Sequence, residues 1–339
     1  MADRTLEIVD VGEATPATAP PYRAPLWLPG GHAQTIWPYI LPRPAMPYRR
    51  ERIGAPDGDF WDFDWIEAPD TPANAPVVVL FHGLEGGSGS HYARALMAAT
   101  TARRWRGVVV HFRGCSGELN RAPRAYHSGD HEEAERLLAA VRVRVAAKVT
   151  VFAVGVSVGG SVLVNWLGRV GERAAKLVAA AAAVSTPLDL TSSGIAIGKG
   201  FNRVYTKHFL DSLKPKSLAM AKRFPGLLDE MRIGAARTMD AFDTAVTSKL
   251  HGFADAADYW DRASSKPWLA TIAIPTLVLN AQNDPFVPRE SLPQPRDVSR
   301  AVVLEQPADG GHAGFLSGPF PGNLEWLPRR LLDFFIAHR

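Results

Sequence analysis

The stretch TVFAVGVSVGGSVLVNWLGRV, residues 150–170, places a serine between an apolar run and a helical pattern. The run at 150–156 predicts a buried strand, and 158–170 predicts a helix. Between them lies Gly155-Val156-Ser157-Val158-Gly159, in which a serine on a sharp strand-to-helix turn would project its hydroxyl over the sheet. The glycines avoid collisions with neighbouring backbone, and the helix dipole favours negative charge at this point. The stretch therefore predicts an exposed, reactive Ser157, although a glycine-rich turn that only begins a helix has the same pattern.

Short apolar runs that end in polar or glycine-rich turns recur on both sides of this stretch. They occupy residues 77–81, 107–112, 177–184, 274–282 and 301–306, and helical patterns cover 131–145 and 324–338. Buried strands that alternate with helices are typical of a parallel sheet covered on both faces. We therefore predict an α/β fold with a mostly parallel, doubly wound sheet, whose ligand crevice lies beyond the carboxyl ends of the strands.

The alternation stops in two places. Residues 1–50 contain nine prolines, which predict an irregular arm without a long helix, held against the body by its aromatic side chains. Residues 187–265 predict several helices without strands, interrupted at Gly198, Gly200, Pro215 and Pro225. We expect residues 51–186 and 266–339 to form the core, with 187–265 inserted between two late strands as a helical cap.

Composition excludes several classes of protein. Of 339 residues, 46% are hydrophobic and 21% charged, which is typical of a globular chain and not of a disordered or coiled-coil one. The longest apolar stretch, residues 177–184, is too short to span a bilayer, and the first residues do not resemble a secretory signal. A single cysteine excludes an intrachain disulfide and a multi-cysteine metal site. A net charge of +4 does not indicate nucleic-acid binding.

A reactive serine needs a base on another loop at the same edge of the sheet. His312, in the glycine-rich stretch at 310–315 after the last predicted strand, meets this requirement. Five other histidines also fall near strand ends, and we expect structural roles for them: His82, His91, His111, His127 and His131. The last two have the i, i+4 spacing of a metal site, but no obvious third ligand is near them in the sequence.

An acid that orients the base should follow a strand and precede the histidine in the chain. Asp284 lies just after the predicted strand at 274–282 and is the first candidate. Asp189 follows the preceding strand and is the second, whereas Asp309 lies too close to His312 on the same loop.

Acyl transfer also needs N–H donors aimed at the oxyanion. The backbone amide of Val158, directly after the serine, is one candidate. The loop at 82–87 follows an early strand and makes the amide of Leu84 the second. We do not interpret this loop as a phosphate-binding loop, because the chain has neither a G-x-x-x-x-G-K-[ST] motif nor a G-x-G-x-x-G motif after a strand.

These elements together resemble the α/β-hydrolase superfamily, and within it the YheT-like branch of esterases. The motifs that carry the resemblance are PLWLPGGHAQT at 25–35, HGLEG at 82–86, FRGCSG at 112–117, YHSGD at 126–130, GVSVGG at 155–160, DPF at 284–286 and GGHAGF at 310–315. The resemblance covers residues 22–335. It implies a charge relay of Ser157, Asp284 and His312, and hydrolysis of carboxylic esters in the cytoplasm without a cofactor or metal.

Two of these motifs leave a choice open. Cys115 could in principle act as a nucleophile, but no base lies in its loop and Ser157 already occupies the turn, so we expect a structural role. The 25–35 segment could contact substrate through His32 or Gln34, or could hold the N-terminal arm in place.

The predicted cap is basic, with seven lysines and arginines and only one acid between residues 199 and 223. This stretch is either a solvated helix face, or a region that meets lipid headgroups or an ester with a carboxylate or phosphate.

The hypothesis that unites these residues is a serine hydrolase that cleaves small carboxylic esters with an apolar acyl group. A thioesterase, a lactonase or an acyltransferase would use the same three residues. A non-catalytic binding protein and a metal-dependent hydrolase are the alternatives from other classes.

Overall fold

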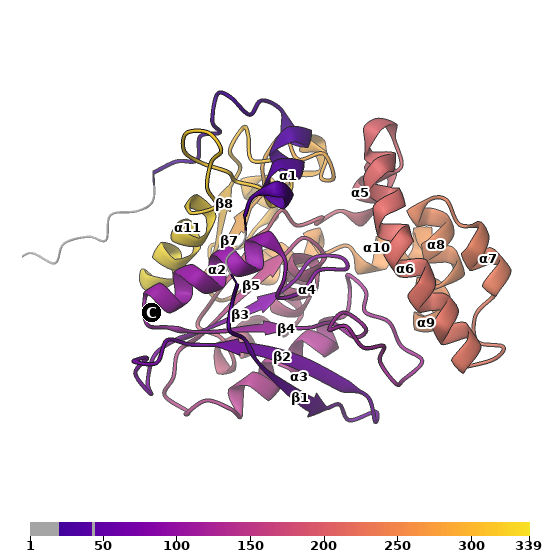
Figure 1. Ribbon diagram of the computed structural model, residues 1–339, viewed down its shortest axis with the longest axis horizontal. Coiled ribbons are helices and arrows are strands. Elements are labelled where there is room, and N and C mark those ends of the chain that lie inside the picture. Colours follow the sequence, from indigo (N-terminus) through magenta and orange to yellow (C-terminus); the bar gives the residue numbers. More distant parts are fainter. Residues whose placement is uncertain (1–19, 43–44) are drawn as a thin grey trace, which may run out of the picture.

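The computed structural model describes residues 20–42 and 45–339, which build an eight-stranded sheet in the order β1-β2-β4-β3-β5-β6-β7-β8 (Figure 1). The strands are β1 (Arg49–Gly54), β2 (Phe60–Ile66), β3 (Val77–Phe81), β4 (Arg106–Val110), β5 (Val151–Val156), β6 (Ala180–Val184), β7 (Thr276–Leu279) and β8 (Val302–Glu305). β2 runs antiparallel to both β1 and β4, and all other neighbours are parallel. This confirms the predicted mostly parallel sheet.

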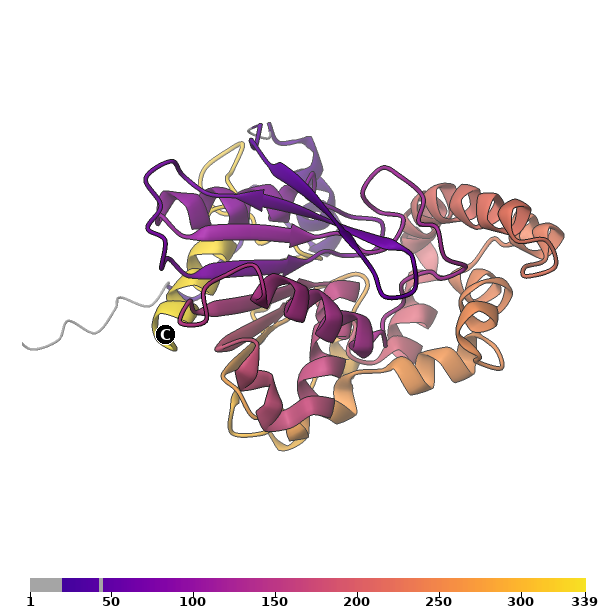
Figure 2. The same cartoon turned by 90° about the horizontal axis from the view of Figure 1, so that it is seen from below.

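Helices cover both faces of the sheet because side chains along each strand alternate between them. On one face, Val77 and Val79 of β3 join the core with α3 (His131–Arg142) and α4 (Val158–Val170). On the other face, Val78 and Leu80 join the core with α2 (His91–Ala102) and α11 (Trp326–Ile336). Because β3, β5, β6, β7 and β8 are parallel, their carboxyl ends lie at the same edge of the sheet. The helices between β6 and β7 cover this edge (Figure 2).

The strands β1 and β2 were not predicted, because the expected alternation begins only after residue 76. Every residue of β2 is buried, including two acids that interrupt its apolar pattern. Asp62 pairs with Arg52 at 2.8 Å, and Asp64 pairs with Arg50 at 2.7 Å, both across the strand pair. Charged residues normally indicate a solvent-exposed face. The aspartates of β2 are instead buried in ion pairs, so the sequence pattern does not indicate a buried strand.

The segment between β6 and β7 consists of helices joined by turns and loops and contains no strand among its residues, 185–275, all of which the structure describes. It contains α5 (Leu190–Ile197), the short 3-10 turn η2 (Gly200–Asn202), α6 (Arg203–Arg223), α7 (Glu230–Ala235), α8 (Met239–Ala245), α9 (Thr247–His251) and α10 (Ala256–Ala263). These helices form a separate group beside the sheet and have a small core of their own, to which Leu210, Ile233 and Phe242 belong (Figure 1). The expected interruption at Pro215 is wrong, because α6 continues through this residue.

The N-terminal segment is more regular than its prolines predict. A ten-residue helix, α1 (Gly31–Ile40), contains Pro38, and β1 begins at Arg49, inside the expected arm. Proline lacks an N–H and leaves the carbonyl of Gln34 without its helical partner. That carbonyl lies so close to Gly314 that a Cβ there would be 2.1 Å from it. Residues 1–19 and 43–44 of the expected arm lie outside the described residues. Among the residues that the structure describes, no helix is long and apolar enough to cross a bilayer.

Candidate active site

Ser157 stands on a sharp turn between β5 and α4, with a φ of +55° that non-glycine residues rarely adopt. The turn is possible because the two flanking glycines lack side chains. A Cβ on Gly155 would lie 2.4 Å from the carbonyl oxygen of Gly159, and a Cβ on Gly159 would lie 2.3 Å from that of Phe81. The backbone therefore holds the Ser157 side chain at the carboxyl edge of the sheet.

Three side chains from separate loops form a hydrogen-bonded chain at this edge. His312 Nε2 lies 2.9 Å from Ser157 Oγ, and His312 Nδ1 lies 2.8 Å from Asp284 Oδ2. The other carboxylate oxygen of Asp284 accepts hydrogen bonds from the backbone N–H groups of Phe286 and Val287. A carboxylate placed in this way keeps the imidazole in the tautomer that accepts the hydroxyl proton at Nε2. The structure thus brings together the three residues that the sequence singles out.

The loop that carries His312 is held by the N-terminal helix. Thr35 Oγ1 accepts a hydrogen bond from the His312 N–H at 2.9 Å. Gln34 Oε1 accepts from the Gly310 N–H at 2.8 Å and from Asn283 Nδ2 at 3.0 Å, and so joins the loop of His312 to the loop of Asp284. Both α1 side chains are buried. The sequence leaves open whether the 25–35 segment contacts substrate or holds the N-terminal arm, and for Gln34 this geometry supports a structural role. Thr35 and Asn283 also support the candidate site, although the sequence gives no reason to single them out.

His32 differs from its neighbours on α1, because its ring is exposed and faces the cap. Its Nδ1 lies 3.1 Å from the hydroxyl of Tyr205 on α6, and the two rings are stacked. The residue therefore joins α1 to the cap, and within the described residues no hydrogen bond links it to Ser157 or His312.

The rival histidines make other contacts. His82 bonds to the Gly83 carbonyl and accepts from the Phe112 N–H, and burial lowers its pKa to about 3. His91 bonds to the carbonyl of Ala313. His111 bonds to Asp64, His127 accepts from the Gly129 N–H, and His131 bonds to the Gly129 carbonyl. Within the described residues no three histidines, cysteines or acids are grouped closely enough to hold a metal ion.

The alternative acids also have other partners. Asp189 caps the N-terminus of α5 by accepting from the Ser192 N–H at 2.9 Å. Asp309 accepts from Asn283 Nδ2 at 2.8 Å. Each carboxylate is therefore engaged away from the imidazole of His312.

Most backbone N–H groups of the 82–87 loop already have acceptors, and that of Leu84 does not among the described residues. The N–H groups of Gly83 and Glu85 donate to the hydroxyls of Tyr92 and Tyr126. Those of Gly86 and Gly87 donate to the Gly83 carbonyl and to the Ser90 hydroxyl. The Leu84 N–H, which has no acceptor in the part of the chain that the structure describes, is free to bind a ligand. A Cβ on Gly83 would lie 3.2 Å from the Cβ of Ser157, so this loop runs directly beside the serine. Leu84 and Val158 line the same cleft as Ser157 and His312.

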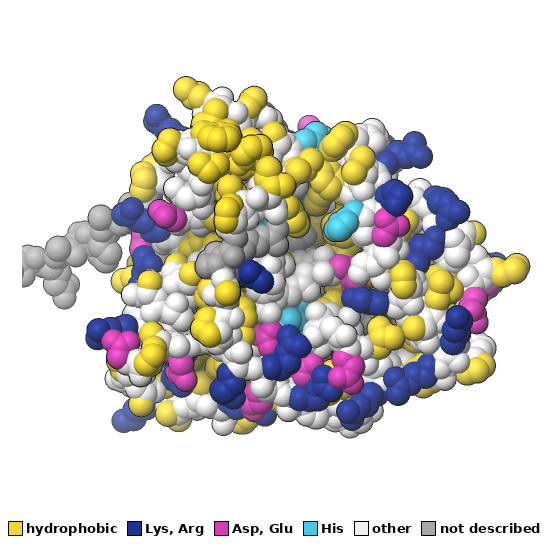
Figure 3. Space-filling view, viewed as in Figure 1, with side chains coloured by type: hydrophobic (Ala, Val, Ile, Leu, Met, Phe, Trp, Pro, Cys, Tyr) yellow, Lys and Arg dark blue, Asp and Glu magenta, His cyan; other side chains and the backbone are white. Residues whose placement is uncertain are grey.

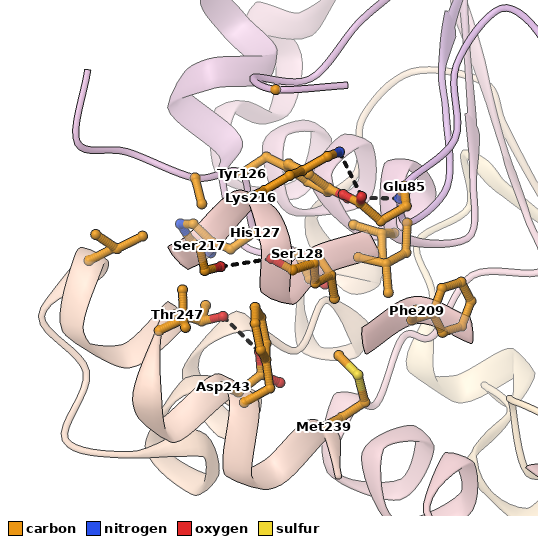
Figure 4. A pocket seen from close by; sticks show the side chains of 18 of the residues that line it. Glu85, Tyr126, His127, Ser128, Phe209, Lys216, Ser217, Met239, Asp243 and Thr247 are labelled. Carbon is orange, nitrogen blue, oxygen red and sulfur yellow. Dashed lines mark hydrogen bonds and ion pairs between the residues drawn. The ribbon is translucent and has the colours of Figure 1, made fainter. Parts of the chain in front are cut away.

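The cleft extends from Ser157 beneath the cap and encloses about 190 Å³. Figure 4 shows its part beneath the cap, with Phe209, Met239 and Asp243 among the side chains that line it. Its walls are mainly apolar side chains of the cap, including Leu190, Ile197, Phe209, Leu213, Met220, Met239, Phe242, Val246 and Leu250. Two carboxylates also line it. Glu85 pairs with Lys216 of α6 at 2.6 Å, while Asp243 accepts from Thr247 Oγ1 and Trp260 Nε1. Both carboxylates are therefore already hydrogen-bonded by protein groups.

Cys115 lies beside this cleft but in an environment that opposes a thiolate. Its Sγ is 3.8 Å from Glu85 Oε1, and burial raises the pKa of the thiol to about 12. Because the thiolate is the reactive form, this environment disfavours a nucleophilic role for Cys115.

Known proteins share this architecture. A family model described as the alpha/beta hydrolase fold matches residues 76–319. The Escherichia coli protein YheT, named as a candidate esterase, is 38% identical over 91% of this chain and 90% of its own length. Human Phospholipase ABHD3 is 28% identical over 95% of this chain and 80% of its own length. A solved structure of the Pyrococcus furiosus esterase Pf2001 has a TM-score of 0.54 at 15% identity, covering 86% of this chain and 92% of that one, which supports the fold alone. The chain therefore belongs to the α/β-hydrolase family, as a YheT-like member.

Proposed function

We propose that this chain is a serine hydrolase of carboxylic esters that works through an acyl-enzyme on Ser157. The observation that carries the proposal is the hydrogen-bonded chain of Ser157, His312 and Asp284 at the end of an apolar cleft. Membership of the α/β-hydrolase family supports hydrolysis as the reaction class, and the three side chains supply its mechanism.

In this mechanism Ser157 Oγ attacks the ester carbonyl while its proton passes to His312 Nε2. Asp284 stabilises the imidazolium that forms. The N–H groups of Val158 and Leu84 bind the oxyanion of the tetrahedral intermediate. His312 then protonates the leaving alkoxide, which leaves the acyl group on Ser157. A water molecule, deprotonated by the same imidazole, attacks this acyl-enzyme, and the acid leaves as His312 returns the proton to Ser157 Oγ.

The cleft supports an apolar acyl group as the part of the substrate that lies under the cap. Its lining side chains are mainly aliphatic and aromatic, and each methylene buried there contributes about 0.8 kcal/mol. The similarity to a protein named a phospholipase agrees with an acyl ester of a lipid as the substrate class.

Two variants test the chemistry. Ser157→Ala should abolish turnover of p-nitrophenyl butyrate, whereas Ser192→Ala, on the first turn of α5, should retain it. Turnover by Ser157→Ala at the rate of the unmodified protein would refute the proposal.

A third variant tests the acyl subsite. Val246→Trp fills part of the cleft and should lower the turnover of long-chain esters more than that of the acetate, and equal losses for both would exclude the cleft as the acyl site.

A further inference from the structure

The surface around α1 is unusually apolar for an exposed face. We define the α1 face as α1 with the turn before it, the end of α5 through the first turn of α6, and the loop at 316–323. Its exposed apolar side chains are Leu26, Ile36, Tyr39, Ile40, Ile195, Phe201, Val204 and Phe320. Leu26 is fully exposed, and Phe320 and Ile40 are 70% and 63% exposed. In the space-filling view hydrophobic side chains gather over α1 and extend toward α5 (Figure 3). Exposed apolar surface on this scale commonly marks an interaction site.

Ring contacts connect the three segments of the α1 face. The ring of Trp27 lies 5.3 Å from that of Phe320 in the 316–323 loop, and His32 lies 4.7 Å from Phe201 on η2. The indole N–H groups of Trp27 and Trp37 donate to the carbonyls of Gly318 and Pro321. The face is therefore a single surface built on bonded aromatic side chains, rather than a set of separate exposed residues.

The charge of this face has one sign. No aspartate or glutamate occurs in residues 20–42, 192–207 or 310–324, which contain the segments of this face and the residues next to them. The same ranges contain Arg23, Lys199, Arg203 and Lys207, all exposed. Lys207 pairs with Asp211 at 2.6 Å, but Lys199 and Arg203 have no carboxylate partner among the described residues. Lys199 and Arg203 thus flank an apolar surface without compensating acids, whereas Lys207 is paired.

We propose that the α1 face binds the surface of an anionic lipid bilayer. Tryptophan, tyrosine and aliphatic side chains on a short helix suit the boundary between headgroups and acyl chains, and lysine and arginine beside them attract anionic headgroups. A second copy of this chain is a poorer occupant. A two-fold dimer through this face would place the same uncompensated cations opposite each other.

The α1 face adjoins the candidate active site. Asn202 of η2 donates to the carbonyl of Pro285, the residue after Asp284, at 2.6 Å. Thr35 of α1 holds the backbone of His312. A protein seated on a bilayer by this face would therefore have Ser157 and its cleft close to lipid esters. The seating itself does not depend on the proposed hydrolysis and is measured without turnover.

Vesicle flotation with the full chain tests the proposal. The protein should float with phosphatidylglycerol vesicles and remain unbound with phosphatidylcholine vesicles. Each basic side chain near an anionic bilayer strengthens binding roughly fivefold, so Lys199→Glu/Arg203→Glu should weaken binding by at least tenfold. Leu26→Asp/Ile40→Asp should also weaken it, since the apolar contact is then lost.

Matched controls lie at the opposite edge of the sheet, where Lys148 and Arg300 are exposed and Val143 is 79% exposed. Lys148→Glu/Arg300→Glu and Val143→Asp should bind vesicles as the unmodified chain does, and all variants should share its Tm. Absence of flotation with phosphatidylglycerol, or equal weakening by the control variants, would overturn the proposal. So would a dimer in solution that the α1-face variants dissociate.

Discussion

His312 Nε2 lies 2.9 Å from Ser157 Oγ, although 155 residues separate the two in sequence. Different contacts position the two side chains. Ser157 is placed by its own turn and flanking glycines, whereas His312 depends on Asp284 and on side chains of α1.

Asp284→Asn tests the orienting carboxylate. An amide at this position no longer secures the imidazole tautomer that accepts the Ser157 proton, so kcat for p-nitrophenyl butyrate should fall by about 10⁴. Asp189→Asn is the matched control, because asparagine caps a helix as well as aspartate does, and its kcat should remain within about twofold. Comparable losses for the two variants would show that Asp284 has no special role.

Thr35 tests the support given by α1. Thr35→Val removes the acceptor for the His312 N–H, and the loss of one such bond, about 1 kcal/mol, predicts a five- to tenfold lower kcat with KM unchanged. Thr35→Ser keeps the hydroxyl and should restore kcat. The rate of labelling by a fluorophosphonate should follow kcat in both variants. If serine is as slow as valine, or if KM changes instead, Thr35 does not position the histidine.

Gly159 tests the geometry of the turn. Gly159→Ala would force a Cβ to 2.3 Å from the Phe81 carbonyl, and backbone on both sides leaves little room for relief. The variant should be destabilised by about 3 kcal/mol or more. Gly234→Ala, in α7 with open space around it, should be stabilised by about 0.5–1 kcal/mol. Denaturant unfolding measures both, and a destabilisation of similar size in both would contradict the steric argument.

Asp243 predicts a pH-dependent stability. Burial raises its pKa from 3.8 to about 6. Between these pH values the folded chain retains a proton that the unfolded chain has released, so this group lowers the free energy of unfolding as pH rises through the window. In Asp243→Asn the contribution disappears. The variant should gain stability relative to the unmodified chain between about pH 4 and pH 7, by at most about 3 kcal/mol. A constant difference in urea unfolding across this range would refute the assignment.

The sequence predicts most of the fold because the central strands are continuous apolar runs that end in recognisable turns. It fails for β1 and β2, whose buried Asp62 and Asp64 look like solvent-facing residues until their arginine partners are seen. It also fails for α1, since prolines alone do not reveal a ten-residue helix that contains one of them.

The sequence likewise predicts some residues of the candidate site and misses others. Ser157, Asp284 and His312 lie on the loops after β5, β7 and β8. The carboxyl ends of parallel strands meet, so the proximity of these loops is predictable. Thr35 and Gln34 reach the site from the other end of the chain, and long-range contacts of this kind have no local signature. The Leu84 amide is predictable from its loop, but only the structure reveals that the N–H groups around it have partners.

The central claim is that Ser157 is the nucleophile. Treating the full chain with a fluorophosphonate and mapping the modified peptide by mass spectrometry tests it directly. We predict a single adduct on Ser157, which is lost in Ser157→Ala and strongly slowed in His312→Asn. An adduct on another residue, or no adduct under conditions in which the protein hydrolyses p-nitrophenyl butyrate, would contradict the claim.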